Sequence, residues 1–195
     1  SIGCFARITD ITPKTDEQLS ELRRLGYNSI TIGVEAGDDE ALSFMHKGFG
    51  TKEIIRECKR LDEAGMEYNF FYLAGIYGRG GEIGAKNTAA VFNQLNPKII
   101  INSMMTIYHT SELYQEIQDG SWKEETEIEK LMELKVLIGN LNIDTYFATM
   151  GASNCVNVEG HLPKDKTRMI KWLDEVISSV DEKELRRYRE NLRHL

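Results

Sequence analysis

The chain has 195 residues, of which 41% are hydrophobic and 28% charged, and its net charge is −7 at pH 7. This composition is ordinary for a globular protein with one domain, or one domain plus an appendage, and the acidic balance argues against nucleic-acid binding. We expect no membrane span and no signal peptide, because the sequence contains neither pattern. Cys4, Cys58 and Cys155 are odd in number and far apart, which predicts free thiols in the cytoplasm.

The first third of the chain alternates between strand and helix patterns. Residues 4–10 predict a short strand, and Thr15 with Gln18 forms a capping box that opens a helix. Gly26 closes that helix, and the alternating apolar residues of 29–35 predict a second strand. The apolar density of this second strand favours a parallel sheet covered on both faces.

The same alternation continues. Asp38 caps a short helix that ends at Met45, and a stronger amphipathic helix follows over 51–65. Residues 67–74 predict an aromatic-rich strand, which runs into the glycine-rich loop 75–81. These elements indicate consecutive β/α units.

The pattern changes after residue 106. A helix over 83–95 and a strand over 98–105 complete the alternation, and the remaining expected elements are helices over 113–117, 124–141, 165–180 and 181–192 and a strand over 144–148. We therefore predict an α/β protein with right-handed parallel connections, with residues 1–106 as a β/α domain and 107–195 as a mostly helical extension. Because closing a barrel takes about eight strands, the domain is either an open sheet or part of a barrel.

Glu35 is the first candidate for chemistry, because it stands at the carboxyl end of a predicted parallel strand. Such a carboxylate can bind ribose hydroxyls or act as an acid or base, or it can simply cap a loop. Arg7, within the first predicted strand, should reach a carboxylate of the protein or of a ligand. Lys47, in a glycine-flanked turn, is either a solvated surface lysine or a partner for a ligand carboxylate.

The loop 75–81 contains enough glycine for its backbone to approach a ligand closely. It matches neither of the common phosphate-binding glycine motifs, so contact with a planar or polar ligand is favoured over phosphate. His109 follows the fourth predicted strand and is expected to be a hydrogen-bonded loop residue. The histidines and cysteines do not have metal-ligand spacing, so we predict no metal site within the chain.

Several phrases taken in order resemble the radical S-adenosylmethionine (radical SAM) superfamily, specifically its oxygen-independent coproporphyrinogen III oxidase-like and B12-associated members. They are Arg7, Ile-Gly-Val-Glu-Ala-Gly at 32–37, Ala-Leu-Ser-Phe-Met-His-Lys-Gly at 41–48, Leu-Ala-Gly-Ile-Tyr-Gly at 73–78, Thr-Ser-Glu-Leu-Tyr at 110–114, Ser-Asn at 153–154 and Gly-His-Leu-Pro at 160–163. The resemblance spans most of the chain.

The resemblance implies a partial TIM-type (β/α) barrel that holds S-adenosylmethionine and a [4Fe–4S] cluster. In that family, reductive cleavage of the cofactor yields a 5′-deoxyadenosyl radical that abstracts hydrogen from a small-molecule substrate, with electrons from an external donor. By resemblance, Glu35 would bind the ribose, and Arg7 and Lys47 would neighbour the methionine end. The backbone of Gly75, Ile76 and Tyr77 would line the adenine. No catalytic residue can be assigned.

Two features depart from the family pattern. The cluster motif CxxxCxxC and the early glycine motif are absent, and Tyr77 replaces the usual proline of the loop. We therefore expect the latter part of a radical SAM domain, inactive alone, whose missing first strands leave an exposed sheet edge able to self-associate.

Two other functions remain open from the sequence. One is a non-catalytic ligand- or partner-binding barrel that has lost its cluster, which the presence or absence of CxxxCxxC upstream would decide. The other is a barrel lyase or aldolase with Glu35 as base, which would need a lysine at the end of a strand.

Overall fold

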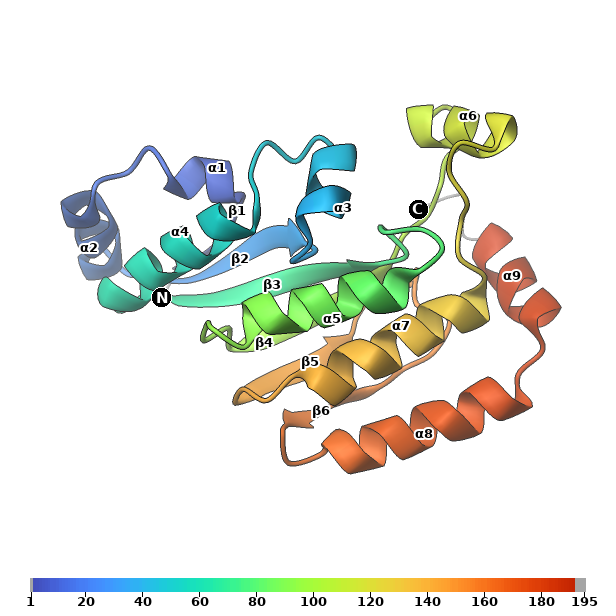
Figure 1. Cartoon of the computed structure of the whole chain (residues 1–195). Helices are drawn as coiled ribbons and strands as arrows, with labels where there is room; N and C mark the ends of the chain where they lie inside the picture. The colour runs from blue at the N-terminus through green and yellow to red at the C-terminus, as the bar shows by residue number, and fades with distance from the viewer. Residues whose placement is uncertain (1, 192–195) are drawn as a thin grey trace.

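The computed structural model describes residues 2–191 and forms one sheet. Its strands are β1 (Ile2–Ala6), β2 (Tyr27–Glu35), β3 (Glu67–Ala74), β4 (Ile99–Met104), β5 (Thr145–Thr149) and β6 (Glu159–Leu162). They lie side by side in chain order, β1 to β5 parallel and β6 antiparallel to β5 (Figure 1). In residues 2–191 no helix is long and apolar enough to cross a membrane.

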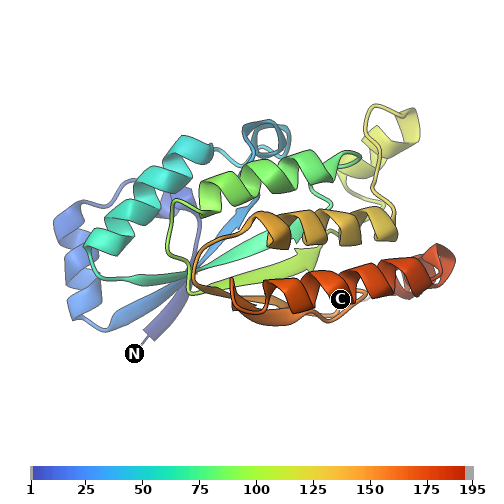
Figure 2. The same cartoon turned by 60° about the horizontal axis from the view of Figure 1, so that its bottom comes forward.

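Helices follow the parallel strands. They are α1 (Ile8–Ile11), α2 (Asp16–Arg24), α3 (Asp39–Phe44), α4 (Thr51–Glu63), α5 (Gly81–Phe92), α6 (Glu112–Asp119), α7 (Glu127–Asn140), α8 (Lys166–Ser179) and α9 (Glu182–Glu190). Figure 2 shows α4, α5, α7 and α8 along one face of the sheet. Sequential strand order with helices on one face is the winding of a (β/α) barrel, whereas doubly wound sheets reverse direction and carry helices on both faces.

The two faces of the sheet differ in burial. On β2, Ile30, Ile32 and Val34 are buried beneath the helices, while the alternate residues are only half-buried. On the half-buried face, Phe5 of β1 is 80% exposed and stacks on Phe71 of β3 with ring centroids 6.2 Å apart. The prediction that β2 is covered on both faces is therefore wrong, because the helices pack on one face only.

The helix starts agree with the capping signals. Thr15 and Gln18 form the predicted capping box of α2, and the side chain of Asp38 accepts the backbone N–H of Ala41 at the start of α3. The first strand is shorter than the predicted span 4–10. It ends at Ala6, because the Asp10 carboxylate accepts the backbone N–H of Arg7 and starts α1.

The sheet continues beyond residue 106. The strand predicted over 144–148 is present as β5, and β6 adds an antiparallel edge that the sequence analysis did not foresee. Helices α8 and α9 are confirmed, although residue 192, the predicted end of the last helix, lies outside the described residues. β1 is the opposite outer strand, and self-association through it stays a prediction.

A close backbone approach follows β2, at Gly37. A Cβ at this position would lie 2.8 Å from the Cα of Thr88 on α5, too close for either backbone to accommodate it. We expect Gly37→Ala to lower the free energy of unfolding by at least about 1 kcal/mol. The matched control is Gly139→Ala in α7, where the nearest contact would be an ordinary 3.6 Å and helix propensity should stabilise by about 0.5–1 kcal/mol. Urea unfolding of both variants measures the difference; equal effects would contradict this packing.

Candidate functional site at the carboxyl edge of the sheet

An ion pair marks the carboxyl end of β2. Lys47 Nζ lies 2.7 Å from Glu35 Oε2, and the side chains are 16% and 31% exposed. The turn after α3 brings Lys47 back to the strand end, and its ammonium lies 5.8 Å from the centre of the Phe49 ring. Glu35 Oε1 lies over Gly33, 3.6 Å from where a Cβ would stand. The pair is thus partly open to solvent, above the half-buried face of the sheet.

Both arms of this ion pair include strained backbone. Glu35 has φ 63° and His46, which precedes Lys47, has φ 51°, and neither is glycine. Left-handed conformations of such residues cost on the order of 1–3 kcal/mol and cluster at binding and catalytic sites. The two strained residues are Glu35 itself and the residue next to Lys47, so the strained backbone lies in both segments that form the ion pair.

The strain at His46 makes a testable difference. We expect His46→Gly to raise the free energy of unfolding by about 0.5–1 kcal/mol, because glycine adopts φ 51° without a steric cost. Ser43→Gly, within α3, should instead lower it by about 0.5 kcal/mol. Thermal unfolding compares the two, and a loss of stability in His46→Gly would show that the histidine side chain matters more than the strain.

The glycine loop after β3 lies at the same edge as Glu35, since Glu35 pairs with Tyr72 three residues before Gly75. The N–H of Gly75 donates to Glu133 Oε2 at 2.8 Å, and the Ile76 side chain is 3% exposed. Tyr77 turns toward α3, where its hydroxyl meets Glu40 Oε2 at 3.5 Å. The hydrogen bond from Gly75 to Glu133 therefore fixes the start of the loop against α7.

Arg7 lies at this edge too, but its side chain does not meet Glu35. It is 69% exposed and pairs with Asp10 at 3.3 Å. The prediction that Arg7 needs a carboxylate is confirmed, and the carboxylate belongs to the protein. The structure thus brings Glu35 and Lys47 into contact and places Gly75, Ile76 and Tyr77 beside them along the sheet edge; the binding role of each residue stays a prediction.

Sequence reasoning missed a buried ionic cluster beside the loop. Lys130 of α7 is fully buried, and its Nζ lies 2.9 Å from Glu124 Oε1 and 3.3 Å from Glu127 Oε1. Burial opposes ionisation of Glu124, but Lys130 and Arg186 outweigh it and lower the pKa of that carboxyl. One feature of the sequence could have indicated this cluster. Glu127, Lys130 and Glu133 are three residues apart, so they lie on one side of the helix, together with leucines that are buried.

Helix α9 supplies two cations to this cluster. Arg186 lies 2.9 Å from Glu124 Oε1, and Arg189 Nε lies 3.0 Å from Glu127 Oε2. Arg189, 6% exposed, also donates to the carbonyls of Met105 and Ser153. It therefore ties the C-terminal helix to the chain segments that follow β4 and β5.

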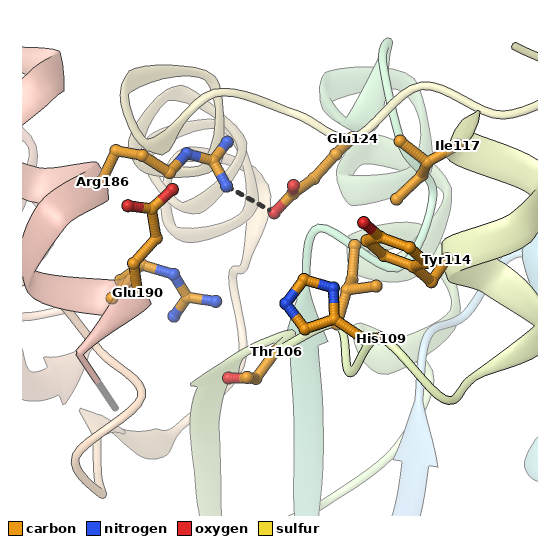
Figure 3. Close-up of a pocket in the computed structure, with 9 residues that line it drawn as sticks. Thr106, His109, Tyr114, Ile117, Glu124, Arg186 and Glu190 are labelled. Atoms are coloured by element: carbon orange, nitrogen blue, oxygen red, sulfur yellow. Dashed lines mark hydrogen bonds and ion pairs between the residues drawn. The ribbon is translucent and has the colours of Figure 1, made fainter. Parts of the chain in front are cut away.

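A cavity of about 140 Å³ opens at the same edge, between α6 and α9 (Figure 3). Its walls are polar on the α9 side and aromatic on the α6 side, and consist of Thr106, Ile107, His109, Tyr114, Ile117, Glu124, Arg186, Arg189 and Glu190. His109 lies in the loop after β4, as predicted, and its ring meets the Tyr114 ring edge-on with centroids 4.6 Å apart. The hydrogen bond expected for it stays a prediction. This is room for a small organic molecule beside the strand ends.

The cysteines do not converge. Cys58 is buried in α4, Cys4 is on β1 and Cys155 follows β5. Burial raises the pKa of Cys155 to about 11, so its thiol stays protonated at neutral pH. Within residues 2–191 no group of three or more histidine, cysteine or acidic side chains is arranged to hold a metal ion.

Comparison with known proteins finds a likeness in fold. No family model matches the chain, and no curated protein matches it. Among solved structures, it is similar to Elp3 of the archaeon Methanocaldococcus infernus, in a form with its N-terminal residues 1–46 deleted, with a TM-score of 0.64 and 15% sequence identity. The alignment covers 88% of this chain and 41% of that one, so the chain spans about two fifths of its length. The predicted class, a partial (β/α) barrel of mainly parallel strands with outer helices, is confirmed.

Proposed function

We propose that this chain is part of a radical SAM enzyme and that it binds S-adenosylmethionine at the carboxyl edge of its sheet. The observation that carries the proposal is the partly open pair of Glu35 and Lys47 beside the glycine loop 75–81. The fold is shared with Elp3, a radical SAM enzyme. The quoted motifs from Arg7 to residues 153–154 lie toward this edge, whereas the motif at 160–163 runs along antiparallel β6 to the opposite edge. Substrates of α/β barrels bind at this end because the strand-end loops converge there.

The residues present fit the nucleoside part of such a cofactor. Lys47 engages Glu35 Oε2, so Glu35 Oε1 over Gly33 is placed to accept from ribose hydroxyls. Lys47 and Arg7 supply positive charge for a carboxylate, and the loop backbone at Gly75 to Tyr77 offers a flat surface for adenine. When bound and cleaved by one-electron reduction, the cofactor would supply hydrogen-abstraction chemistry. The chain's own residues would orient and hold it.

The residues present do not fit a [4Fe–4S] cluster, because Cys4, Cys58 and Cys155 lie in separate parts of the fold. We derive no step through the cluster. Its ligands would come from a segment of a longer protein outside this chain, and so would the contact with an external electron donor.

The subtype is proposed on the motifs alone. They resemble oxygen-independent coproporphyrinogen III oxidase-like enzymes, and we propose that the longer protein is of this type without assigning its substrate. The cavity between α6 and α9 is the proposed substrate entrance, because its lining residues Thr106 and Ile107 follow β4 at the carboxyl edge of the sheet, where Glu35 also lies.

The test is anaerobic reconstitution of the complete protein with iron and sulfide, followed by S-adenosylmethionine and a reductant. We expect 5′-deoxyadenosine to form. S-adenosylmethionine that is bound but never cleaved would instead support a barrel that only binds its ligand.

A further inference from the structure

Two buried carboxyl groups anchor both ends of the glycine loop 75–81. Glu125 and Glu133 are each 1% exposed. The N–H of Gly75 donates to Glu133 Oε2 at 2.8 Å, and the N–H of Gly81 donates to Glu125 Oε1 at 3.1 Å. The hydroxyl of Tyr72 on β3 donates to Glu133 Oε1. The conformation of the loop therefore depends on where these two side chains stand.

The two carboxyl groups also touch each other. Both pack against Gly81, where a Cβ would lie 2.4 Å from Glu125 Oε1 and 2.8 Å from Glu133 Oε2. Glu125 and Glu133 are within hydrogen-bond contact, and Glu125 Oε2 is buried with no other donor. Two ionised carboxylates packed against the same glycine have no proton to donate to each other, and their like charges repel. A single proton between them satisfies the contact.

The surrounding charges favour that proton. Groups that titrate or carry charge face the pair from each element packed around it: Tyr72 on β3, Asp38 at the start of α3, Glu124, Glu127 and Lys130 at the start of α7, and Arg186 and Arg189 on α9. Asp38 is held separately by Asn87 Nδ2 at 2.6 Å. The four glutamates 124, 125, 127 and 133 meet only three cations, and Asp38 and Glu182 add further negative charge nearby. An added proton therefore reduces an excess of negative charge.

We propose that Glu125 and Glu133 share one proton and that the protonated pair positions the glycine loop. When the pair releases its proton to solvent, repulsion separates the carboxyl groups and frees the N–H groups of Gly75 and Gly81. Burial and the contact with Glu133 raise the pKa of Glu125 to about 10, and burial also raises the pKa of Glu133. The shared proton and its effect on the loop do not depend on the proposed function. Only the proposed contact of the loop backbone with adenine does.

The proton makes stability depend on pH. Glu125 holds it when folded and loses it on unfolding at any pH between the ordinary value of 4.5 and about 10. The equilibrium constant for unfolding should therefore rise by up to about tenfold for each pH unit across that range. Glu125→Gln cannot titrate, yet its amide can still donate to Glu133 and accept from Gly81. We expect this variant to lose most of that dependence.

Urea unfolding of this chain between about pH 5 and pH 9 measures the effect, with Glu175→Gln on the exposed side of α8 as the control. The control should keep the wild-type dependence. If Glu125→Gln also keeps it, the shared proton is disproved. Should Glu125→Gln fail to fold, infrared spectra of the wild type decide, because the carbonyl band of a protonated carboxyl must be present at pH 7 and its absence overturns the proposal.

The positioning role has a separate measurement. Amide hydrogen exchange of Gly75 and Gly81, expressed as protection factors to remove the intrinsic pH dependence, should lose protection together as the carboxyl band disappears. Protection that stays constant through that transition would show that the pair does not position the loop. No nucleoside enters any of these measurements, so their outcome is independent of the proposed cofactor.

Discussion

Replacing Lys130 with methionine is expected to lower the free energy of unfolding by about 3–5 kcal/mol, as for the loss of one partner from a buried ion pair. The ammonium is fully buried and lies within 3.3 Å of two carboxylates, Glu124 and Glu127. Methionine fills a similar volume, so the loss reflects the greater excess of buried negative charge rather than a cavity; Glu124 and Glu127 keep only arginine partners on α9. Chemical denaturation at neutral pH measures it.

Two further variants separate charge from packing. Lys171→Met, on the exposed side of α8, removes the same charge and should change stability little. The double variant Lys130→Met with Glu127→Gln should regain part of the loss, because it removes one negative charge from a cluster that has lost one positive charge. A loss below about 1 kcal/mol in Lys130→Met would show that the buried cluster tolerates the missing charge.

Replacing Glu35 with glutamine is expected to weaken binding of S-adenosylmethionine to the complete protein by about 10- to 100-fold, the range for a lost hydrogen bond to a charged group. Glutamine keeps the shape of the side chain but removes the negative charge that pairs with Lys47. The same charge strengthens the proposed hydrogen bonds from the ribose hydroxyls. Stability should change much less, because both side chains of the ion pair are partly exposed. Equilibrium dialysis with labelled cofactor provides the measurement.

The matched control for Glu35 is Glu67→Gln, at the exposed amino end of β3 and so at the opposite edge of the sheet. It removes the same charge from the chain and should leave cofactor affinity unchanged. Equal weakening by both variants would point to the overall charge of the protein rather than to the edge site.

Local patterns predicted the elements that form this edge. Apolar alternation in 29–35 and the aromatic residues of 67–74 predicted the strands β2 and β3, and one face of each strand is buried. The contact between Glu35 and Lys47 could also have been predicted from the sequence, because the short helix α3 and its following turn return the chain to the carboxyl edge of the sheet. The left-handed backbone at Glu35 carries no signal in the sequence, because glutamate rarely adopts it.

The buried charges could not be predicted in the same way. Glu133 meets Tyr72 and Gly75 across about sixty residues of chain, and a helix rich in glutamate and lysine resembles a solvated one. Arg189 looked like part of a polar surface helix, and only packing of α9 against α7 buries it. β6 is only four residues long, and its sequence Glu-Gly-His-Leu contains a single large apolar residue, so it gave no strand signal.

The central claim is that Glu35, Lys47 and the loop 75–81 hold a nucleoside at the carboxyl edge of the sheet. A crystal structure of the complete protein with S-adenosylmethionine tests it most directly. The account predicts a ribose hydroxyl within hydrogen-bond distance of the Glu35 carboxylate and adenine against the backbone at Gly75 to Tyr77. Cofactor bound away from Glu35, for example in the cavity between α6 and α9, would contradict it.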